Sequence, residues 1–187
     1  MDIRTRLRMA LLEGKHKKKH KNDYGCVMVY LNVDQDKWDA MQDMIDEEDL
    51  YQPEDDPSYG KETEPHVTVL FGLHNDIPDS DIEDEINKIK EPKIKFGDIS
   101  SFSNPKFDVL KFDVDSKDMH QLNKKFREFP YTSDYPDYHP HCTIAYLKPN
   151  MSKKYIKKLK DFVDIDMETS HVVYSKSNGR KKSYKLS

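Results

Sequence analysis

Apolar residues follow two spacings along the chain, one typical of strands and one typical of helices. Runs of β-branched, aromatic and other apolar residues, bounded by turn-forming residues, predict strands. These predicted strands are residues 24–33, 65–71, 93–102, 106–114, 140–146, 171–175 and 183–186. A Ser-Asn-Gly turn lies between the last two, so we expect them to form a hairpin.

Helices are predicted where apolar residues recur every three or four positions. One follows Asp34, a residue type that caps helix N-termini, and places a core-facing stripe that begins at Trp38. Ser152 is expected to cap a lysine-rich helix that continues to Phe162. The other predicted helices span residues 4–12, residues 79–90 and a segment from Asp115 or Ser116 to Phe126.

The order of these elements indicates a fold class. The strand at 65–71 and the strand at 140–146 each have a helix before and after them. This repetition predicts a protein of two related α+β halves.

The strands at 65–71 and 140–146 also carry the same short motif, Pro-His-x-Thr followed by apolar residues. The motif histidines and threonines are His66 with Thr68, and His141 with Thr143. Side chains alternate between the faces of a strand, so each pair shares one face, with backbone positions roughly 7 Å apart. Two such strands are predicted to direct both pairs onto one phosphate-sized group.

Histidine and threonine suit the cleavage of a phosphodiester. The reaction needs a base for the nucleophile, an acid for the leaving oxygen, and donors for the non-bridging oxygens. Histidine titrates near neutrality, so two histidines can take the opposite roles at one pH. If a ribose 2′-hydroxyl is the nucleophile, no metal is needed, and direct attack by water stays open. We therefore predict a catalytic site without metal or cofactor.

A metal centre is the alternative reading of the second motif. His139 and His141 form His-Pro-His, which could hold a metal if another histidine or a carboxylate joined them. A zinc site needs three or four converging ligands, and the chain has no diagnostic spacing such as His-Glu-x-x-His. The sequence therefore favours the prediction of no metal.

Charge is distributed unevenly along the 187 residues, although the formal net charge is only −4. Residues 1–22 are strongly basic, whereas residues 34–64 are acidic and include a loop at 47–63 that is long enough for a lid or specificity element. A basic arm can bind nucleic acid or an acidic partner, but such runs are also typical of solvated tails. An acidic body argues against a long nucleic acid, which requires many phosphate contacts. A small nucleotide fits this balance better.

The chain is expected to be cytoplasmic and to have no membrane partner. It contains no apolar run long enough to span a bilayer, and its first residues lack the apolar stretch of a signal peptide. Its two cysteines, Cys26 and Cys142, lie in apolar strand-like segments, where reduced thiols are expected.

The two His-x-Thr motifs and the element order resemble the 2H phosphoesterase superfamily. The resemblance covers most of the chain from Tyr24 onward, so residues 1–22 are predicted to be a basic arm and residues 23–187 one bilobal domain. It implies an α+β fold of two pseudo-symmetric lobes, whose antiparallel sheets form a central cleft with helices packed outside. It also implies a metal-independent phosphodiesterase, a hydrolase, whose catalytic residues are His66, Thr68, His141 and Thr143.

Other segments are similar to phage anti-CBASS proteins, which degrade the cyclic oligonucleotide signals of a bacterial immune system. These segments are residues 24–26, residues 64–68 and the basic C-terminal hairpin. The similarity implies hydrolysis of 3′,5′ linkages in cyclic oligonucleotides, immune evasion by a phage protein in the host cytoplasm, and stacking of Tyr24 on a nucleobase of the substrate.

Three other functions stay open. The first is a 2′,3′-cyclic phosphodiesterase or 2′,5′-oligonucleotide phosphodiesterase acting on RNA. The second is a nucleotide sponge that binds without cutting, and the third is an interaction protein that uses the basic arm. The bases, linkage and ring size of the substrate, the role of each histidine and the oligomeric state are not determined by the sequence.

Overall fold

The computed structural model describes residues 24–133, 136–163 and 165–186. The helix predicted at residues 4–12 and the basic arm predicted at residues 1–22 lie outside the described residues. The described strands are β1 (Tyr24–Val33), β2 (His66–His74), β3 (Lys95–Ser103), β4 (Asp108–Asp115), β5 (His141–Leu147), β6 (Met167–Ser175) and β7 (Lys181–Lys185). The helices are α2 (Gln35–Asp43), α3 (Asp79–Ile86), α4 (Lys117–Phe126) and α5 (Ser152–Lys158), with short 3-10 turns η1 (Glu47–Asp49) and η2 (Lys160–Phe162).

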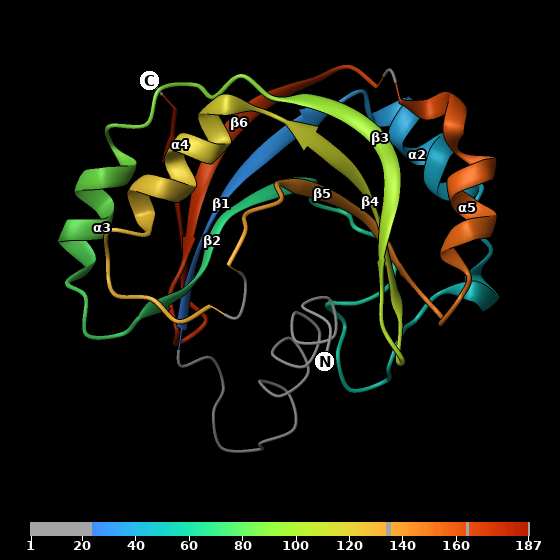
Figure 1. Cartoon of the computed structure of the whole chain (residues 1–187), viewed down its shortest axis with the longest axis horizontal. Coiled ribbons are helices and arrows are strands. Elements are labelled where there is room, and N and C mark those ends of the chain that lie inside the picture. The colour runs from blue at the N-terminus through green and yellow to red at the C-terminus, as the bar shows by residue number, and fades with distance from the viewer. Residues whose placement is uncertain (1–23, 134–135, 164, 187) are drawn as a thin grey trace.

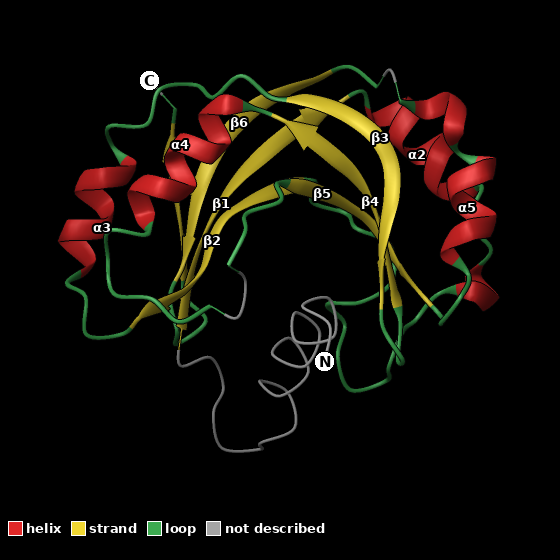
Figure 2. Cartoon of the chain, in the orientation of Figure 1, coloured by secondary structure: helices red, strands yellow, loops and turns green. Residues whose placement is uncertain are grey.

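The strands form one antiparallel sheet of seven strands in the order β3-β4-β5-β2-β1-β6-β7. Figure 1 shows that this sheet bends into an arch, with α3 and α4 outside one limb and α2 and α5 outside the other. The concave side of the arch carries none of the described helices (Figure 2). The predicted α+β fold with antiparallel strands and outer helices is confirmed. The two lobes share one continuous sheet instead of contributing separate sheets.

The two lobes repeat one order of elements and exchange helices. The order β1-α2-β2-α3 is repeated, after β3, as β4-α4-β5-α5. Helix α2 crosses to the limb of β4, where the ring of Trp38 lies 6.2 Å from that of Phe112. Helix α4 makes the reciprocal crossing, and its Asn123 amide donates a hydrogen bond of 2.7 Å to the Val69 carbonyl of β2. Each lobe is therefore completed by a helix from the other.

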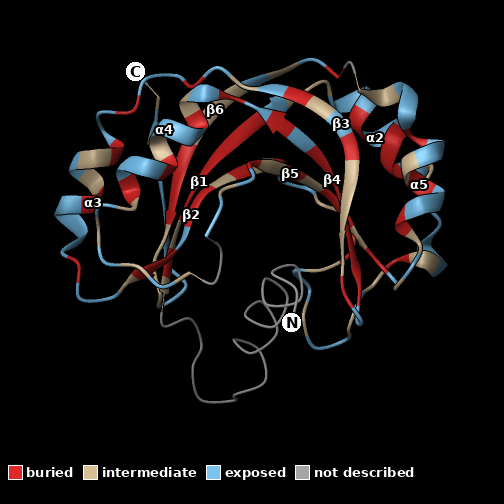
Figure 3. Ribbon diagram, in the orientation of Figure 1, coloured by how far each residue is buried: buried red, intermediate tan, exposed pale blue. Residues whose placement is uncertain are grey.

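The core lies between the sheet and the outer helices, where buried positions concentrate (Figure 3). Trp38 is 1% exposed in this core, so its predicted core position is confirmed. A second and smaller cluster joins Met28, Tyr30 and Val173, with Cys26 packed against it. Because side chains alternate along β1, this cluster lies on the opposite, concave face of the sheet. The two faces of β1 therefore have different environments.

Two predicted helices are shorter than expected. Helix α5 begins at Ser152 itself, so Ser152 is not the residue that caps it. The Ser152 amide donates a hydrogen bond of 3.0 Å to the carboxylate of Asp108 on β4, and this carboxylate takes the place of the predicted serine cap. Helix α5 ends at Lys158 and is followed by η2 instead of continuing to Phe162. Helix α3 ends at Ile86, where hydrogen bonds tighten to three-residue spacing.

None of the described helices is long and apolar enough to span a membrane. The acidic loop at 47–63 is not a detached lid, since both of its ends pair with β5. Leu50 forms a bridge with Leu147, and Lys61 forms one with Ala145. This loop therefore extends the limb that contains β5.

Gly72 is required where residues 130–132 approach β2. Its φ is 107°, its carbonyl accepts a 2.9 Å hydrogen bond from the Thr132 amide, and an added Cβ would lie 2.0 Å from the Thr132 carbonyl oxygen. We expect Gly72→Ala to lower the free energy of unfolding by at least about 2 kcal/mol, measured by chemical denaturation. Gly179→Ala is the matched control, because Gly179 also has a positive φ of 81° but nothing within 4 Å of an added Cβ. Equal losses in the two variants would contradict the steric argument.

Candidate active site

The two predicted motifs meet at the centre of the sheet. Strands β2 and β5 pair through Val67 and Cys142, which are both 0% exposed and belong to the core beneath the helices. The residues on either side of this pair are half-buried and lie on the concave face. The residues so gathered around one point of the concave face are His66, Thr68, His141 and Thr143.

The prolines give each motif the same backbone connection. The carbonyl of Pro65 accepts a hydrogen bond of 2.9 Å from the Leu31 amide of β1. The carbonyl of Pro140 accepts one of 3.1 Å from the Val114 amide of β4. A proline has no amide hydrogen but keeps its acceptor, so it can open a strand while still pairing with the neighbouring strand.

The two histidine rings are held in the same way. Nδ1 of His66 lies 2.9 Å from the Glu64 carbonyl, and Nδ1 of His141 lies 2.9 Å from the His139 carbonyl. A carbonyl oxygen only accepts, so Nδ1 carries the proton in each ring and donates it. Nε2 of each histidine is therefore the nitrogen placed to exchange a proton with a substrate.

The surroundings of His66 are aromatic and acidic. The ring of Tyr30, its partner on β1, stacks on His66 with centroids 5.3 Å apart and on His171 of β6 with centroids 4.9 Å apart. A carboxylate oxygen of Glu62 lies 3.9 Å from Nδ1 of His66. His66 therefore lies between an aromatic ring and a carboxylate.

The surroundings of His141 are different. Its partner on β4 is Asp113, and Phe102 meets its ring edge-on at 5.0 Å. Lys111 is only 4% exposed and donates to Asp113 and, at 2.7 Å, to the hydroxyl of Ser100. Burial lowers the pKa of His141 to about 4, and the charge of Lys111 adds to this effect, against the opposing hydrogen bond to the His139 carbonyl. His141 is therefore neutral at neutral pH.

This lowered pKa makes the stability of the protein depend on pH. The ordinary histidine pKa is 6.5 and that of folded His141 about 4, so between these values the unfolded chain binds the extra proton. His141 therefore costs stability as pH falls through this window. We expect the free energy of unfolding of the parent to fall between pH 7 and pH 4.5, and to fall by about 1–2 kcal/mol more than that of His141→Gln. This difference is smaller than the full pKa shift would give, because the ring of His141 is partly exposed. Denaturation at both pH values measures this, and parallel losses in the two proteins would contradict it.

Thr68 is held by contacts with the loop before β5 and with β1. The hydroxyl of Tyr138, in the loop before β5, donates 2.7 Å to the Thr68 backbone carbonyl. Burial raises the pKa of the Cys26 thiol to about 12, and a hydrogen bond with Thr68 opposes this rise. Cys26 and Cys142 are both free, as predicted.

Tyr24 lies farther from the motifs than the other predicted site residues. It is the first residue of β1 and pairs with His74 at the far end of β2 from His66. Its half-buried ring lies 5.8 Å from that of His74 and 6.4 Å from that of Phe71. Stacking of Tyr24 on a nucleobase stays a prediction.

Metal ligands do not converge among residues 24–133, 136–163 and 165–186. In this part of the chain no three histidine, cysteine, aspartate or glutamate residues are grouped to hold an ion. His139, which the alternative hypothesis of a metal site includes, is exposed. Its backbone carbonyl, and not its ring, contacts Nδ1 of His141.

A family model described as the 2′-5′ RNA ligase superfamily matches residues 35–181 and so includes both motifs. The chain belongs to this superfamily. The predicted membership of the 2H phosphoesterases is confirmed at this level. A comparison with curated protein sequences gives no match. Among solved structures, the chain is similar to Usb1 of Kluyveromyces marxianus, solved with uridine monophosphate, at 10% identity and a TM-score of 0.48, over 89% of this chain and 99% of the other.

Proposed function

We propose that this protein is a metal-independent phosphodiesterase that cleaves 3′,5′ linkages of cyclic oligonucleotides by two-histidine catalysis. The observation that carries the proposal is the duplicated His-Thr pair around the Val67 and Cys142 junction, with both Nδ1 atoms held by carbonyls. Two proton-transfer groups and two hydroxyls at one point are what cleavage of a phosphodiester requires.

The different surroundings of the two histidines support separate roles. His141 is neutral and acts as the base, taking the proton of the attacking ribose 2′-hydroxyl or water at Nε2. The attacking oxygen forms its bond to phosphorus as the bond to the leaving oxygen breaks. His66, with the Glu62 carboxylate 3.9 Å away, acts as the acid and gives its proton to the leaving oxygen. Thr68 and Thr143 donate to the non-bridging oxygens.

The substrate and biological role rest on the similarity of residues 24–26 and 64–68 to phage anti-CBASS proteins. On this basis the protein removes a cyclic oligonucleotide signal in the cytoplasm of a bacterial host and so evades CBASS immunity. Residues 23–187 supply the catalytic domain, and the basic residues 1–22 are an accessory arm.

A second candidate is a phosphodiesterase that acts on RNA. The superfamily match favours it, because the description of the family names an enzyme that acts on RNA, the 2′-5′ RNA ligase. The same four residues would then process a 2′,3′-cyclic phosphate or a 2′,5′ linkage. The two candidates share the chemistry and differ in substrate.

The deciding experiment offers both substrate classes to the purified protein in EDTA. The panel contains 3′,3′-cyclic dinucleotides, cyclic trinucleotides, 2′,5′-oligoadenylate and nucleoside 2′,3′-cyclic phosphates, with products resolved by mass. Turnover of a cyclic oligonucleotide that disappears in His141→Ala supports the proposal. Turnover of only the last two classes supports the RNA candidate, and tight binding without turnover would make the protein a nucleotide sponge.

A further inference from the structure

Strand β2 contains a β-bulge directly after its motif threonine. Consecutive residues of β1 pair with Thr68 and Leu70, so Val69 is an extra residue in β2. An extra residue reverses the alternation of the side chains that follow. Phe71 therefore lies on the concave face with His66 and Thr68, although it comes five and three positions after them, which would place it on the other face of a regular strand.

Strand β5 repeats this bulge at the equivalent position. Consecutive residues of β4 pair with Thr143 and Ala145, so Ile144 is the extra residue. Tyr146 is thereby turned to the concave face with His141 and Thr143. The duplicated unit is longer than the visible motif, since it also contains a bulge and an aromatic residue five positions after the histidine.

Both bulges are held by a buried amide from the opposite lobe. Asn123 of α4 donates 2.7 Å to the carbonyl of Val69, and Gln42 of α2 donates 3.1 Å to the carbonyl of Ile144. Both amide side chains are buried. The Ile144 carbonyl also accepts a hydrogen bond of 2.9 Å from the Glu62 amide. The crossing helices therefore each contribute a buried hydrogen bond to one bulge.

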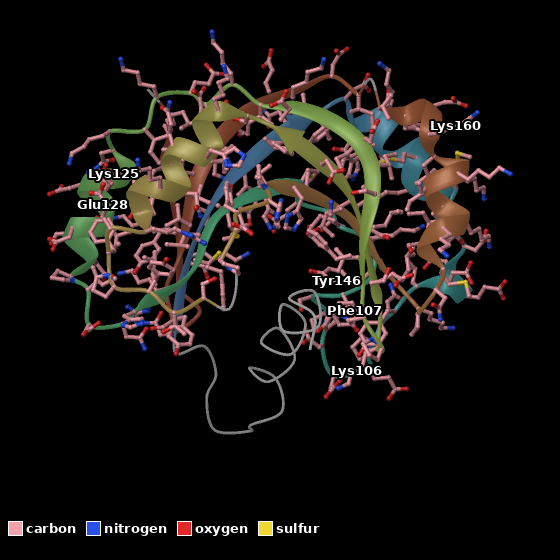
Figure 4. The ribbon with its side chains drawn as sticks, viewed as in Figure 1. Lys106, Phe107, Lys125, Glu128, Tyr146 and Lys160 are labelled. Carbon is pink, nitrogen blue, oxygen red and sulfur yellow. The ribbon has the colours of Figure 1, made fainter. Side chains whose placement is uncertain are left out.

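The two aromatic rings are presented on the concave face. Phe71 is 51% exposed, and its ring meets Tyr24 at a centroid distance of 6.4 Å. Tyr146 is half-buried and is supported edge-on by Tyr59 at 4.9 Å and Phe107 at 5.6 Å. Figure 4 shows Tyr146 and Phe107 together on the inner side of the limb that contains β4. Phe71 is the exposed large apolar side chain of the described residues, and it lies on the same face as the motif residues, where a ligand can reach it.

The two rings lie on opposite sides of the phosphate-binding pairs. Phe71 is four residues beyond Val67 in β2, and Tyr146 is four residues beyond Cys142 in β5. Since β2 and β5 are antiparallel and pair at these residues, the rings are displaced in opposite directions, each by roughly 13 Å of strand. A phosphate at the centre would therefore have an aromatic surface on each side.

We infer that Phe71 and Tyr146 each stack on one nucleobase, so that the substrate is an internal phosphodiester joining two nucleosides. The phosphate lies between the two histidines, and the base on either side of it lies on one ring. This inference rests on the proposed function and deepens it, because a mononucleoside cyclic phosphate would occupy only one ring. Stacking on an aromatic side chain is expected to change affinity on the order of ten- to a hundredfold per base.

The test removes rings and bases separately. The probes are the dinucleoside monophosphate ApA and two ApA derivatives that lack either the 5′ or the 3′ base. The values of kcat/KM are measured for the parent, Phe71→Ala and Tyr146→Ala, with Phe71→Tyr and Tyr146→Phe as ring-retaining controls. Tyr146→Leu is added because alanine leaves a gap beside Tyr59 and Phe107. Dissociation constants for the same probes are measured in the His141→Ala background, where turnover is blocked.

The expected result is a pairing of each ring with one base. Phe71→Ala should lower kcat/KM on the order of ten- to a hundredfold for ApA, and should leave it unchanged for the one probe that lacks the base stacked on Phe71. Tyr146→Ala should lower kcat/KM for ApA by a similar factor, and should leave it unchanged for the probe that lacks the other base. Equal losses on all probes, or a parent insensitive to base removal, would overturn the inference while leaving the proposed hydrolysis intact. If no probe is turned over but the dissociation constants still match each ring with one base, the proposed hydrolysis is overturned and the two base-stacking sites are supported.

Discussion

His66→Ala and His141→Ala are each expected to lower kcat by about 10² to 10⁴-fold on the substrate that the panel identifies. The loss is large because each ring presents a single nitrogen, Nε2, for proton transfer while its Nδ1 is bound to a carbonyl. Both variants should remain folded, since both rings lie on the concave face and outside the main core. Steady-state kinetics in EDTA measures the effect, and far-UV circular dichroism checks the fold.

His120→Ala is the control for these variants. His120 is an exposed histidine of α4 whose ring contacts Tyr138, and it is not part of either motif. Its kcat should stay within a few-fold of the parent. Added imidazole should restore part of the activity of His141→Ala, because a free base can enter the space left by the ring. Ordinary turnover in either motif variant would exclude the two-histidine assignment.

Local signals in the sequence predicted most of the elements. The strand at 24–33 has the bounds of β1, and Asp34 accepts a hydrogen bond from a backbone amide in the first turn of α2. Of Asp115 and Ser116, the two residues predicted to begin α4, Ser116 is the one that accepts such a bond. The prediction that Ser152 caps its helix was wrong. The Ser152 amide is instead bound by the carboxylate of Asp108, which lies 44 residues earlier in the chain, on strand β4. An interaction of that kind depends on the packed sheet and leaves no mark near the helix.

The same distinction applies to the candidate site. The His-x-Thr pairs are visible because two residues of one strand always share a face. Tyr30 and Lys111 were missed as neighbours of the histidines and threonines, because only the register of β1 and β4 places them there. Phe71 and Tyr146 were missed for a further reason. Simple alternation places them on the core face, and only a bulge in each motif strand reverses this. A repeat of an aromatic residue five positions after each histidine was the available signal.

The motif hydroxyls are expected to matter almost as much as the rings. Thr68→Val and Thr143→Val should each lower kcat by about 10² to 10³-fold, the usual cost of removing one donor to a developing oxyanion. Valine keeps the branched shape of threonine, so the change removes the hydroxyl and leaves the packing in place. Thr169→Val is the control, because Thr169 on β6 hydrogen-bonds to Glu91, outside both motifs. It should keep the parent kcat.

The split between kcat and KM determines what the hydroxyls do. Donors that bind the transferring phosphate more strongly in the transition state than in the ground state should lower kcat and kcat/KM together. The loss should be similar for Thr68 and Thr143, because each lies beside a histidine at the same distance from the Val67 and Cys142 pair. A rise in KM with kcat unchanged would mean that the hydroxyls only hold the ground state. In that case stabilisation of the oxyanion would have to come from another donor, and the first to test is Lys111, which pairs with Thr143 across β4 and β5.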